Sequence, residues 1–353
     1  MESLVVVGYI NTGRWSTTAS LKAARVHHTS TVLFDGRVIT VGGTEAGNGV
    51  EFYSSTTENW SAGPPMVYAR VIHAATLLPD GRLFVTGGYF SNAYIKAVEI
   101  YNPTTNSWTS VSSMNTARGG HQAVYLPSPW NKILVMGGYT SNRLPALFSC
   151  ELYDFATNTW TNTTSMIHSR VYFSAIYLPS LDKVVVMGGA YSGGYNAAAM
   201  YTVSTAQWAP SVNTMQGDLY SHTATFLPSI GQVLVVGSYA LPNSTALFNP
   251  ISNSFTMVAS IREGRREHSA ILLPSHLVLV TGGFFHNNSI YRSAEVYDYR
   301  VNAWRSVASM VNGRYRHSLV LLNNPSSPSV LAVGGQIQHG YSSSSCEVFF
   351  VKG

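Results

Sequence analysis

Residues 81–90, GRLFVTGGYF, hold the pattern that decides the fold: an apolar strand ending in two glycines and followed by an aromatic residue. Close copies are GRVITVGG at 36–43, NKILVMGGY at 131–139, DKVVVMGG at 182–189 and LVLVTGGFF at 277–285. The glycine pairs begin at Gly42, Gly87, Gly137, Gly188, Gly237, Gly282 and Gly334, with Ser238 as the second residue of the fifth pair. A spacing of 45 to 52 residues between pairs indicates seven structural repeats.

Two further landmarks keep a constant distance within the repeats. An aromatic residue, usually Trp, follows another, usually Tyr, by seven residues: Tyr53 and Trp60, Tyr101 and Trp108, Tyr153 and Trp160, Tyr201 and Trp208, Phe248 and Phe255, Tyr297 and Trp304. An arginine then follows the second aromatic residue by ten residues, as Arg70 follows Trp60. Constant spacing of this kind marks the scaffold of each repeat.

The segments between these landmarks have the pattern of short β-strands. The segment HAATLL at 73–78 has small side chains near its start and large ones at its end, which suits a strand that begins near a crowded axis. The run before each glycine pair is continuously apolar, as in strands covered on both faces, and a turn such as NPTTNS at 102–107 separates a third strand from a fourth. We therefore predict one domain over 1–353, an all-β, seven-bladed propeller of four-stranded antiparallel blades. The predicted blade cores are 25–62, 70–110, 118–162, 170–210, 219–257, 265–306, and 314–353 together with 4–18.

The glycine pairs, the Tyr–Trp spacing and the arginine before the first strand resemble the kelch repeat over essentially the whole chain. The resemblance implies a kelch-type β-propeller, distantly similar to the central propeller of galactose oxidase. The local departures are Phe173 in place of histidine, Leu219 in place of arginine, Ser238 and Phe255. Kelch propellers serve as adaptors, adhesins, lectin-like modules and a few enzymes, so the resemblance specifies the fold and leaves the function open.

The two ends of the chain predict how the ring closes. The last repeat stops after its third strand, whereas Trp15 stands ten residues before Arg25, as a fourth-strand tryptophan should. We expect the strand around Trp15 to pair with the strand around Val348. Residues 4–9 are an alternative for this closing strand.

Two sets of repeated polar residues are predicted to be structural. One is the histidine at the start of the first strand: His28, His73, His121, His222, His268 and His317. Seven inner strands packed at about 10 Å place each strand roughly 11 Å from the axis, too far for these histidines to share a metal with bonds of about 2 Å. The other set pairs the arginines with a third-strand glutamate: Arg25 and Glu51, Arg70 and Glu99, Arg118 and Glu151, Arg265 and Glu295, Arg314 and Glu347. We expect five buried ion pairs, because an unpaired buried charge is costly.

The segment from each glycine pair to the following Tyr or Phe varies between 11 and 16 residues, and this variation marks loops available for binding. Strand alternation places these loops on the same face as the segments that carry the arginines. Aromatic residues recur in the loops beside Asn and Ser, which suits the stacking of a sugar or the anchoring of a peptide. Arg170 joins the candidates, for a ligand carboxylate or sulfate, because Ala199 stands at the glutamate position of its repeat. The candidate ligand-binding residues are Tyr89, Phe90, Tyr94, Tyr139, Arg143, Arg170, Tyr191, Tyr195, Tyr239, Phe284, Phe285, His286, Tyr291 and Tyr341.

Composition narrows the classes of function. Lys and Arg exceed Asp and Glu by only 21 to 16, and there is no basic cluster, so we expect no nucleic-acid partner. No apolar run reaches the roughly 18 residues of a membrane helix, so we expect no membrane insertion. Cys150 and Cys346 fall in blades that are not neighbours, so we expect two unpaired buried thiols and no copper-radical site. No serine elbow, HExxH motif or close carboxylate pair is present, and we predict no catalytic residues, metal or cofactor.

The sequence thus favours a non-catalytic recognition module that binds a glycan or an exposed peptide through its aromatic loop face. Low charge and abundant Ser, Thr and Asn favour an extracellular or secreted setting, with the cytoplasm as the alternative. A second hypothesis is an intracellular kelch adaptor that binds an acidic peptide through rim arginines, and a third is a small-molecule enzyme with an axial pocket. A propeller of this kind can also be one part of a larger polypeptide.

Overall fold

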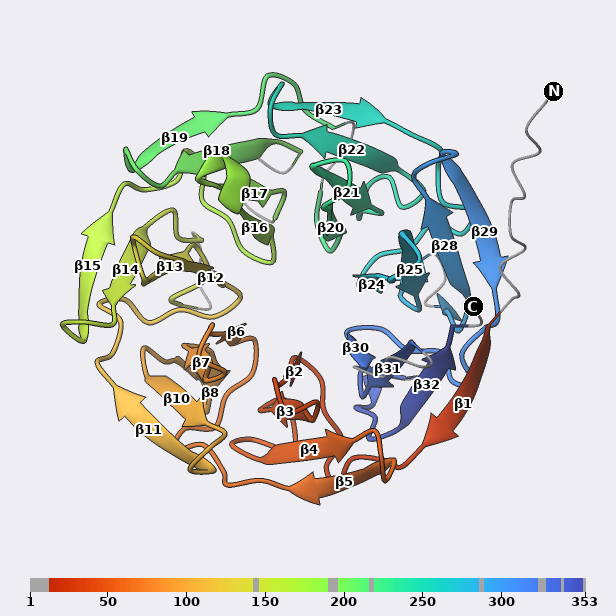
Figure 1. Cartoon of the computed structure of the whole chain (residues 1–353), viewed down its shortest axis with the longest axis horizontal. Helices are drawn as coiled ribbons and strands as arrows, with labels where there is room; N and C mark the ends of the chain where they lie inside the picture. The colour runs from red at the N-terminus through yellow and green to blue at the C-terminus, as the bar shows by residue number, and fades with distance from the viewer. Residues whose placement is uncertain are drawn as a thin grey trace.

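The computed structural model describes residues 13–141, 146–189, 196–215, 219–285, 289–322, 328–337 and 340–351. Seven four-stranded antiparallel sheets surround a central axis (Figure 1), which confirms the predicted seven-bladed propeller. In each blade the first strand lies nearest the axis and the fourth forms the outer wall (Figure 1).

The strands of the first four blades follow the chain in order from the axis outward. Blade 1 contains β2 (Thr29–Val32), β3 (Val38–Val41), β4 (Val50–Ser54) and β5 (Asn59–Ala62). Blade 2 contains β6 (Ala74–Leu77), β7 (Leu83–Thr86), β10 (Val98–Asn102) and β11 (Ser107–Val111), with an added hairpin of β8 (Tyr89–Phe90) and β9 (Ala93–Tyr94). Blade 3 contains β12 (Gln122–Leu126), β13 (Lys132–Met136), β14 (Cys150–Asp154) and β15 (Thr159–Thr163). Blade 4 contains β16 (Ser174–Leu178), the 3₁₀ turn η1 (Pro179–Leu181), β17 (Lys183–Met187), β18 (Ala198–Thr202) and β19 (Gln207–Pro210).

The last three blades repeat this order, except that the outer strand of the seventh comes from the start of the chain. Blade 5 contains β20 (Thr223–Leu227), β21 (Gln232–Val236), β22 (Thr245–Asn249) and β23 (Ser254–Met257). Blade 6 contains β24 (Ser269–Leu272), β25 (Leu277–Thr281), β28 (Ala294–Asp298) and β29 (Ala303–Val307), with a hairpin of β26 (Phe284–Phe285) and β27 (Ser289–Ile290). Blade 7 contains β30 (Ser318–Leu322), β31 (Ser329–Val333), β32 (Cys346–Phe350) and β1 (Arg14–Thr18).

Ring closure occurs as the Trp15 spacing predicts. Strand β1 pairs antiparallel with β32, with Trp15 opposite Phe349 and Ser16 opposite Val348. The alternative closing segment, 4–9, lies outside the described residues. Pairing the two ends of the chain in one sheet completes the seventh blade and leaves no gap in the ring (Figure 1).

The hydrophobic core lies between neighbouring blades. Phe84 and Ile100 of blade 2, for example, pack with Ile133, Val135 and Tyr153 of blade 3. The constant tryptophan joins the blades through a hydrogen bond, since Trp160 Nε1 donates to the backbone oxygen of Ser112 in the preceding connection at 2.7 Å. Equivalent bonds run from Trp60 to Ala19, Trp108 to Pro64, Trp208 to Thr164 and Trp304 to Ala259.

Blade 5 lacks this indole, and an asparagine takes over the connection. The side chain of Asn213 donates to the backbone oxygen of Phe255 at 2.9 Å and accepts from its backbone nitrogen at 2.7 Å. The replacement of Trp by Phe255 is therefore compensated by two hydrogen bonds to the preceding connection.

The five predicted Arg–Glu pairs are present and buried. The N···O distances are 2.8 Å for Arg25–Glu51, 2.5 Å for Arg70–Glu99 and Arg118–Glu151, 3.1 Å for Arg265–Glu295 and 2.6 Å for Arg314–Glu347. Each glutamate also accepts two backbone N–H bonds from the segment leading to its arginine, as Glu151 does from Asn115 and Thr116. The pairs therefore fix the path of the chain as it enters each blade.

Candidate ligand-binding face

We call the arginine that precedes the first strand of a blade the framework arginine; it is Arg25, Arg70, Arg118, Arg170, Arg265 or Arg314, and Leu219 takes its place in blade 5. The residue two positions after this site has a left-handed backbone in every blade. These seven residues are His27, Ile72, Gly120, Tyr172, Ser221, Glu267 and Arg316, with φ between 49° and 65°. They are linked from blade to blade, because the backbone nitrogen of Gly120 donates to the oxygen of Ile72 at 2.8 Å and that of Arg316 donates to Glu267 at 2.9 Å. Only one of the seven is glycine, although non-glycine residues rarely adopt this conformation. The inter-blade hydrogen bonds hold the other six in place.

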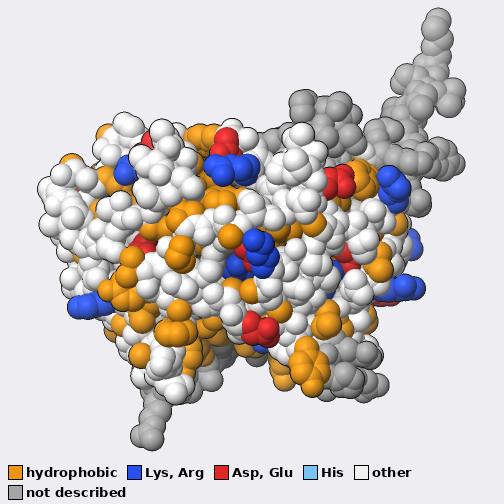
Figure 2. Space-filling view, turned by 90° about the horizontal axis from the view of Figure 1, so that it is seen from below, with side chains coloured by type: hydrophobic (Ala, Val, Ile, Leu, Met, Phe, Trp, Pro, Cys, Tyr) orange, Lys and Arg blue, Asp and Glu red, His pale blue; other side chains and the backbone are white. Residues whose placement is uncertain are grey.

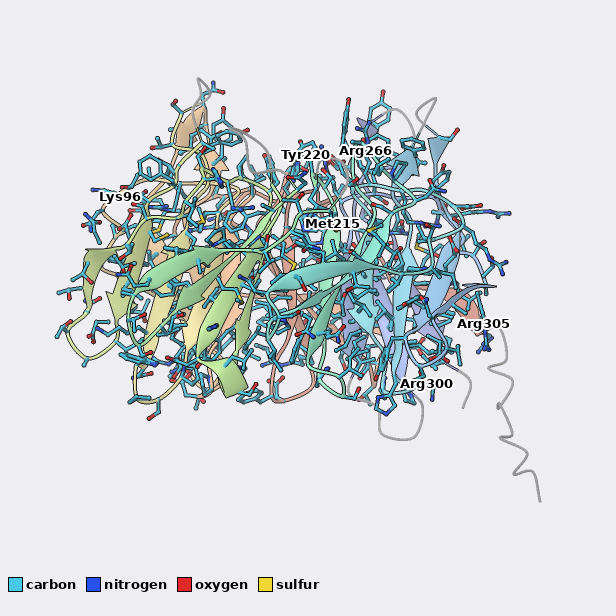
Figure 3. All side chains as sticks on the ribbon, turned by 90° about the horizontal axis from the view of Figure 1, so that it is seen from above. Lys96, Met215, Tyr220, Arg266, Arg300 and Arg305 are labelled. Carbon is cyan, nitrogen blue, oxygen red and sulfur yellow. The ribbon has the colours of Figure 1, made fainter. Side chains whose placement is uncertain are left out.

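The loops after the glycine pairs lie on the same face as these residues. Isolated β-bridges join Val71 to Tyr89, Gly119 to Tyr139, Arg266 to Phe284, and Tyr315 to Gln336. Each bridge connects the residue directly after the arginine position to the residue directly after the glycine pair. We call this end of the propeller the loop face. Tyr220 and Arg266 lie close together at this end, whereas Arg300 lies at the opposite end (Figure 3).

A pocket of about 370 Å³ opens on the loop face near the axis. Its lining comes from blades 1, 4, 5, 6 and 7: His27, Tyr172, Tyr220, Ser221, His222, Glu267, His268, Ser269, Arg316 and His317. Five of the seven left-handed positions (His27, Tyr172, Ser221, Glu267 and Arg316) therefore line one space. The lining combines a carboxylate, a guanidinium, phenols and imidazoles, so the pocket offers both hydrogen-bond donors and acceptors.

An ion pair spans the pocket between blades 6 and 7. Arg316 Nε and Nη2 each lie 2.7 Å from an oxygen of Glu267. Burial opposes the charge of Arg316, but the hydrogen bond to Glu267 and the attraction of the Glu267 charge together outweigh burial and raise the pKa of the guanidinium. The pKa of His27 shifts in the opposite direction, because burial and, to a smaller extent, the charge of Arg316 lower it to about 4. At neutral pH the pocket thus holds one fixed ion pair and uncharged His27.

A row of five tyrosines crosses blades 2 to 5 on the loop face, and we call it the tyrosine arc: Tyr94, Tyr139, Tyr172, Tyr220 and Tyr239. Neighbouring ring centroids lie 6.4, 6.1, 6.4 and 6.1 Å apart in that order. The rings are tilted by 53° to 74° to one another rather than stacked face to face. Tyr172 is 37% exposed and Tyr239 54%. Burial raises the pKa of Tyr172 to about 12, so its hydroxyl keeps its proton at neutral pH.

Arg266 continues the arc into blade 6. Its guanidinium carbon lies 4.3 Å from the ring centre of Tyr239 and 4.4 Å from that of Phe284. Among the described residues, no carboxylate lies within 4.0 Å of this guanidinium and no side-chain hydrogen bond is made by it. Beyond Phe284 the contacts reach Tyr315 of blade 7, 4.9 Å away. Aromatic rings and Arg266 therefore follow one another, in contact, across the loop face from blade 2 to blade 7.

The candidate residues expected from the sequence fall into several environments. Tyr89, Tyr94, Tyr139, Tyr239 and Phe284 lie in the arc or in contact with its neighbours. Phe90 and Phe285 lie in the two added hairpins, and Tyr341 is a separate exposed ring. Tyr291 covers the buried Arg265, 5.5 Å from its guanidinium carbon. Arg143, Tyr191, Tyr195 and His286 lie outside the described residues.

Arg170 occupies the same buried position as the other framework arginines and is only 2% exposed. Its Nη1 donates to the backbone oxygens of Gly188 at 2.5 Å and Ala197 at 3.1 Å. Burial lowers its pKa to about 10, so the side chain is charged at neutral pH. Among the described residues, Arg266 contacts rings of the loop face and Arg316 lines its pocket.

Sequence reasoning missed Tyr172, Tyr220, Arg266, Glu267, Tyr315 and Arg316. The signal was present at the two positions between the framework arginine and the histidine. The second position holds a different residue in each of the seven repeats, and the first is Val in three repeats and Gly, Tyr or Arg in the others. Variation in loop length pointed instead to the segments after the glycines. A comparison of residue identity within the segment from the arginine to the histidine, whose length is the same in every repeat, would have identified the residues that line the pocket.

The inner histidines have the predicted structural role. Their Nε2 atoms hydrogen-bond with hydroxyl groups: His28 with Ser318, His73 with Thr29, His121 with Thr86, His222 with Ser174, His268 with Thr223 and His317 with Thr281. Within the described ranges, no group of three or more His, Cys, Asp or Glu side chains could hold a metal ion. Cys150 and Cys346 are unpaired and buried, and burial raises the pKa of Cys150 to about 12.

Repeated Arg–Glu pairs, Tyr–Trp pairs and glycine turns define this protein as a kelch-repeat β-propeller. A kelch-motif model matches residues 72–115, and a model of the Attractin/LZTR1 beta-propeller family matches residues 101–337. The chain belongs to the Attractin/LZTR1 β-propeller family.

Relatives agree with this assignment. Kelch-like protein 23 of Homo sapiens is 25% identical over 199 residues, covering 54% of this chain and 33% of that protein. Kelch-like protein 36 of Rattus norvegicus is 27% identical over 221 residues, covering 59% and 34%. The chain thus spans about a third of the length of these relatives.

A solved fungal alcohol oxidase of the AA5 family, in complex with copper, has a TM-score of 0.76 at 16% identity and covers 97% of this chain and 77% of that one. At this identity the likeness shows the fold alone. Over the described part of the chain, no helix is both long and apolar enough to span a membrane.

Proposed function

We propose that the loop face binds an exposed segment of a partner protein. The observation that carries this proposal is that most of the pocket lining and two arc tyrosines, Tyr172 and Tyr220, come from the two positions after the framework arginine, where residue identity varies among the repeats. Scaffold positions repeat because the fold needs them, whereas positions that differ at constant backbone geometry can serve recognition. The kelch-repeat relatives support a protein-interaction module.

The distribution of side chains on the surface favours the loop face, rather than the side wall, as the binding site. On the wall seen in Figure 2, charged side chains are scattered singly or in small groups among hydrophobic and uncharged ones. The loop face instead gathers rings that contact one another beside a polar pocket. Aromatic residues and arginine dominate the binding energy of protein interfaces, and both kinds are concentrated here.

The pocket and the arc would make different contributions. The rings offer apolar area and hydroxyl groups at low entropic cost. The pocket, at about 370 Å³, could take a polar side chain that bonds to the Glu267–Arg316 pair. An ion pair held between two blades offers a donor group and an acceptor group at fixed positions.

The other hypotheses remain distinct from this one. A glycan would use the same rings, and an acidic peptide would use Arg266 and Arg316 on the loop face. An enzyme using the axial pocket would have to work with His222, His268 and His317, whose Nε2 atoms already bond to hydroxyls. The extracellular setting expected from composition finds no support in the relatives, and the cytoplasmic alternative is compatible with them.

Selection from a random peptide-display library on the purified protein tests the proposal. We expect enriched peptides whose binding is lost in Tyr172→Leu and kept in Tyr177→Leu, which changes a tyrosine in the inner strand β16. A glycan array probed at two salt concentrations provides the comparison. Absence of any enriched peptide, or peptides that bind both variants equally, would refute binding at the loop face.

A further inference from the structure

The backbone of the loop face is already hydrogen-bonded along the arc. Tyr139 N donates to Gly119 O at 2.8 Å, and Gly119 N donates back at 3.0 Å. Tyr172 N donates to Gly120 O at 3.1 Å, and Tyr239 N donates to Tyr220 O at 3.0 Å. Binding by strand addition needs a sheet edge with unused N–H and C=O groups. These bonds leave the side chains, rather than a backbone edge, to recognise a ligand along the arc.

The spacing of the rings suits an extended ligand of a particular kind. From Tyr139 through Tyr172 and Tyr220 to Tyr239, successive centroids are 6.1, 6.4 and 6.1 Å apart. A polyproline II helix rises about 3.1 Å per residue, so two residues advance about 6.2 Å, whereas two residues of a β-strand advance about 6.6 Å. Three ring-to-ring steps therefore correspond to about six residues of polyproline II.

The chemistry of the rings agrees with that spacing. A polyproline II segment has no internal hydrogen bonds, so its carbonyl groups can accept bonds from tyrosine hydroxyls, and its proline rings can pack against aromatic faces. Because the arc rings are tilted by 55° to 74° along this stretch, they form ridges with troughs between them. Such a segment is also preformed, so little conformational entropy is lost on binding.

Arg266 adds a charge preference at one end of the arc. The rings of Tyr239 and Phe284 both contact its guanidinium, and within the described residues its side-chain donors have no hydrogen-bond partner. A guanidinium fixed in this way presents donors suited to a carboxylate. Arg316, in contrast, is already paired with Glu267, since its Nη2 donates a hydrogen bond to Oε1 and its Nε lies 2.7 Å from Oε2.

We infer that the ligand of the loop face is a proline-rich segment in polyproline II conformation, carrying an acidic residue at the end that meets Arg266. This inference rests on the proposed function and names the chemistry of its ligand. The tyrosine arc binds the extended segment, and the contact between Arg266 and the acidic residue determines the direction in which the segment lies.

Fluorescence anisotropy with synthetic peptides tests the inference. The probe is an amidated peptide of about six prolines, the length of three ring steps, followed by two aspartates. Comparison peptides replace the prolines with Gly and Ser, or the aspartates with asparagine. We expect the probe to bind about tenfold more tightly than the Gly/Ser peptide and about fivefold more tightly than the asparagine peptide.

Matched variants connect each preference to its residue. Tyr139→Leu and Tyr172→Leu should each weaken the probe about fivefold, and Tyr177→Leu should not. Arg266→Met should abolish the preference for aspartate, whereas Arg305→Met, in the outer strand β29 (Figure 3), removes the same charge and should keep it. Thermal melting of every variant confirms that it is folded.

Equal binding of proline and Gly/Ser peptides would overturn the inference, as would an aspartate preference that survives Arg266→Met. Library peptides that depend on Tyr172 but show no proline enrichment would also overturn it while leaving the proposed function intact. Acidic glycans that bind in place of the probe, with the same dependence on the arc, would overturn both.

Discussion

The framework arginines and the two residues that follow each of them lie side by side in the chain but obey opposite rules. Arg118 is fully buried, pairs with Glu151 and donates to Gly137 O, and four other blades repeat the same arrangement. The next two positions are Gly119 and Gly120 in this blade but Arg266 and Glu267 in blade 6. Their backbone is held equally firmly, yet their side chains differ completely.

This contrast separates two uses of a charged residue. In the framework, a cation and an anion removed from water satisfy each other in five blades, and blade 5 lacks both, with Leu219 and Ala246. Blade 4 is the exception, since Arg170 is kept without the glutamate and donates to two backbone oxygens. On the loop face the hydrogen bonds between blades are made by the backbone, so the side chain can change without loss of these bonds. Recognition can therefore diversify within a constant scaffold.

The largest effect should come from breaking a framework pair. Arg118→Met leaves Glu151 buried without its cation, and we expect a loss of about 3–5 kcal/mol in the free energy of unfolding. Arg170→Met leaves no framework glutamate behind, because Ala199 stands at that position, so we expect about 1–2 kcal/mol from the two carbonyls that lose a donor. Urea unfolding of both variants measures the difference. Equal losses would show that the pairing does not set the cost.

A slightly smaller effect should follow from filling the space at a glycine turn. Gly87 has φ +57°, and a Cβ there would lie 2.3 Å from the backbone oxygen of Arg118 in the next blade. We expect Gly87→Ala to cost about 3 kcal/mol, from the left-handed backbone and the forced separation of two blades.

Gly231 is the matched control, since its φ is +64° and nothing lies within 4 Å of the position that an alanine methyl group would take there. Gly231→Ala should cost only about 1 kcal/mol, the conformational part alone. If denaturant midpoints of the two variants coincide, the close approach between blades contributes nothing.

The fold could be read from the sequence because each blade repeats the same constraints. The Trp160 bond to Ser112, the Arg118–Glu151 pair and the glycine turn at Gly137 each require a fixed spacing, and seven copies make that spacing visible. Ring closure by Trp15 followed from the same spacing.

The site was only partly predictable, because residues that differ between the repeats mark it, rather than residues that recur. Tyr139 and Tyr239 stand out next to glycine pairs, but Tyr172 and Arg266 lie in a segment that otherwise looks like scaffold. Their proximity depends on hydrogen bonds between blades, such as Tyr172 N to Gly120 O, which connect residues distant in sequence. Arg170 looked like a rim residue because the sequence does not show its burial.

The inner histidines extend the comparison to pH. Burial lowers the pKa of His28 and His121 to about 3 and that of His222 to about 4, while an unfolded histidine titrates near 6.5. Between the folded and the unfolded pKa values, the histidines of the unfolded chain bind protons that those of the folded chain do not. The free energy of unfolding therefore decreases as the pH falls below about 6.5. Each histidine should contribute about 1.4 kcal/mol per pH unit.

His121→Phe copies the natural state of blade 4, which has Phe173 at this position, and should make the pH dependence shallower by one histidine. Urea unfolding between pH 7 and pH 5 measures the slope, with His276→Phe, an exposed position, as the control. An unchanged slope for His121→Phe would mean that this histidine is protonated in the folded protein.

The smallest effect should come from a loop-face position, and its sign is the informative part. Ile72 has φ 49°, a conformation that costs a β-branched residue about 1–2 kcal/mol and that asparagine adopts more readily. Its backbone nitrogen bonds to His27 O and its oxygen accepts from Gly120 N, and neither bond involves the side chain. We therefore expect Ile72→Asn to stabilise the protein by about 0.5 kcal/mol, after the lost apolar contact is subtracted. A loss of more than about 1 kcal/mol in urea unfolding would show that side chains at these positions support the ring, and the division between scaffold and recognition would not hold there.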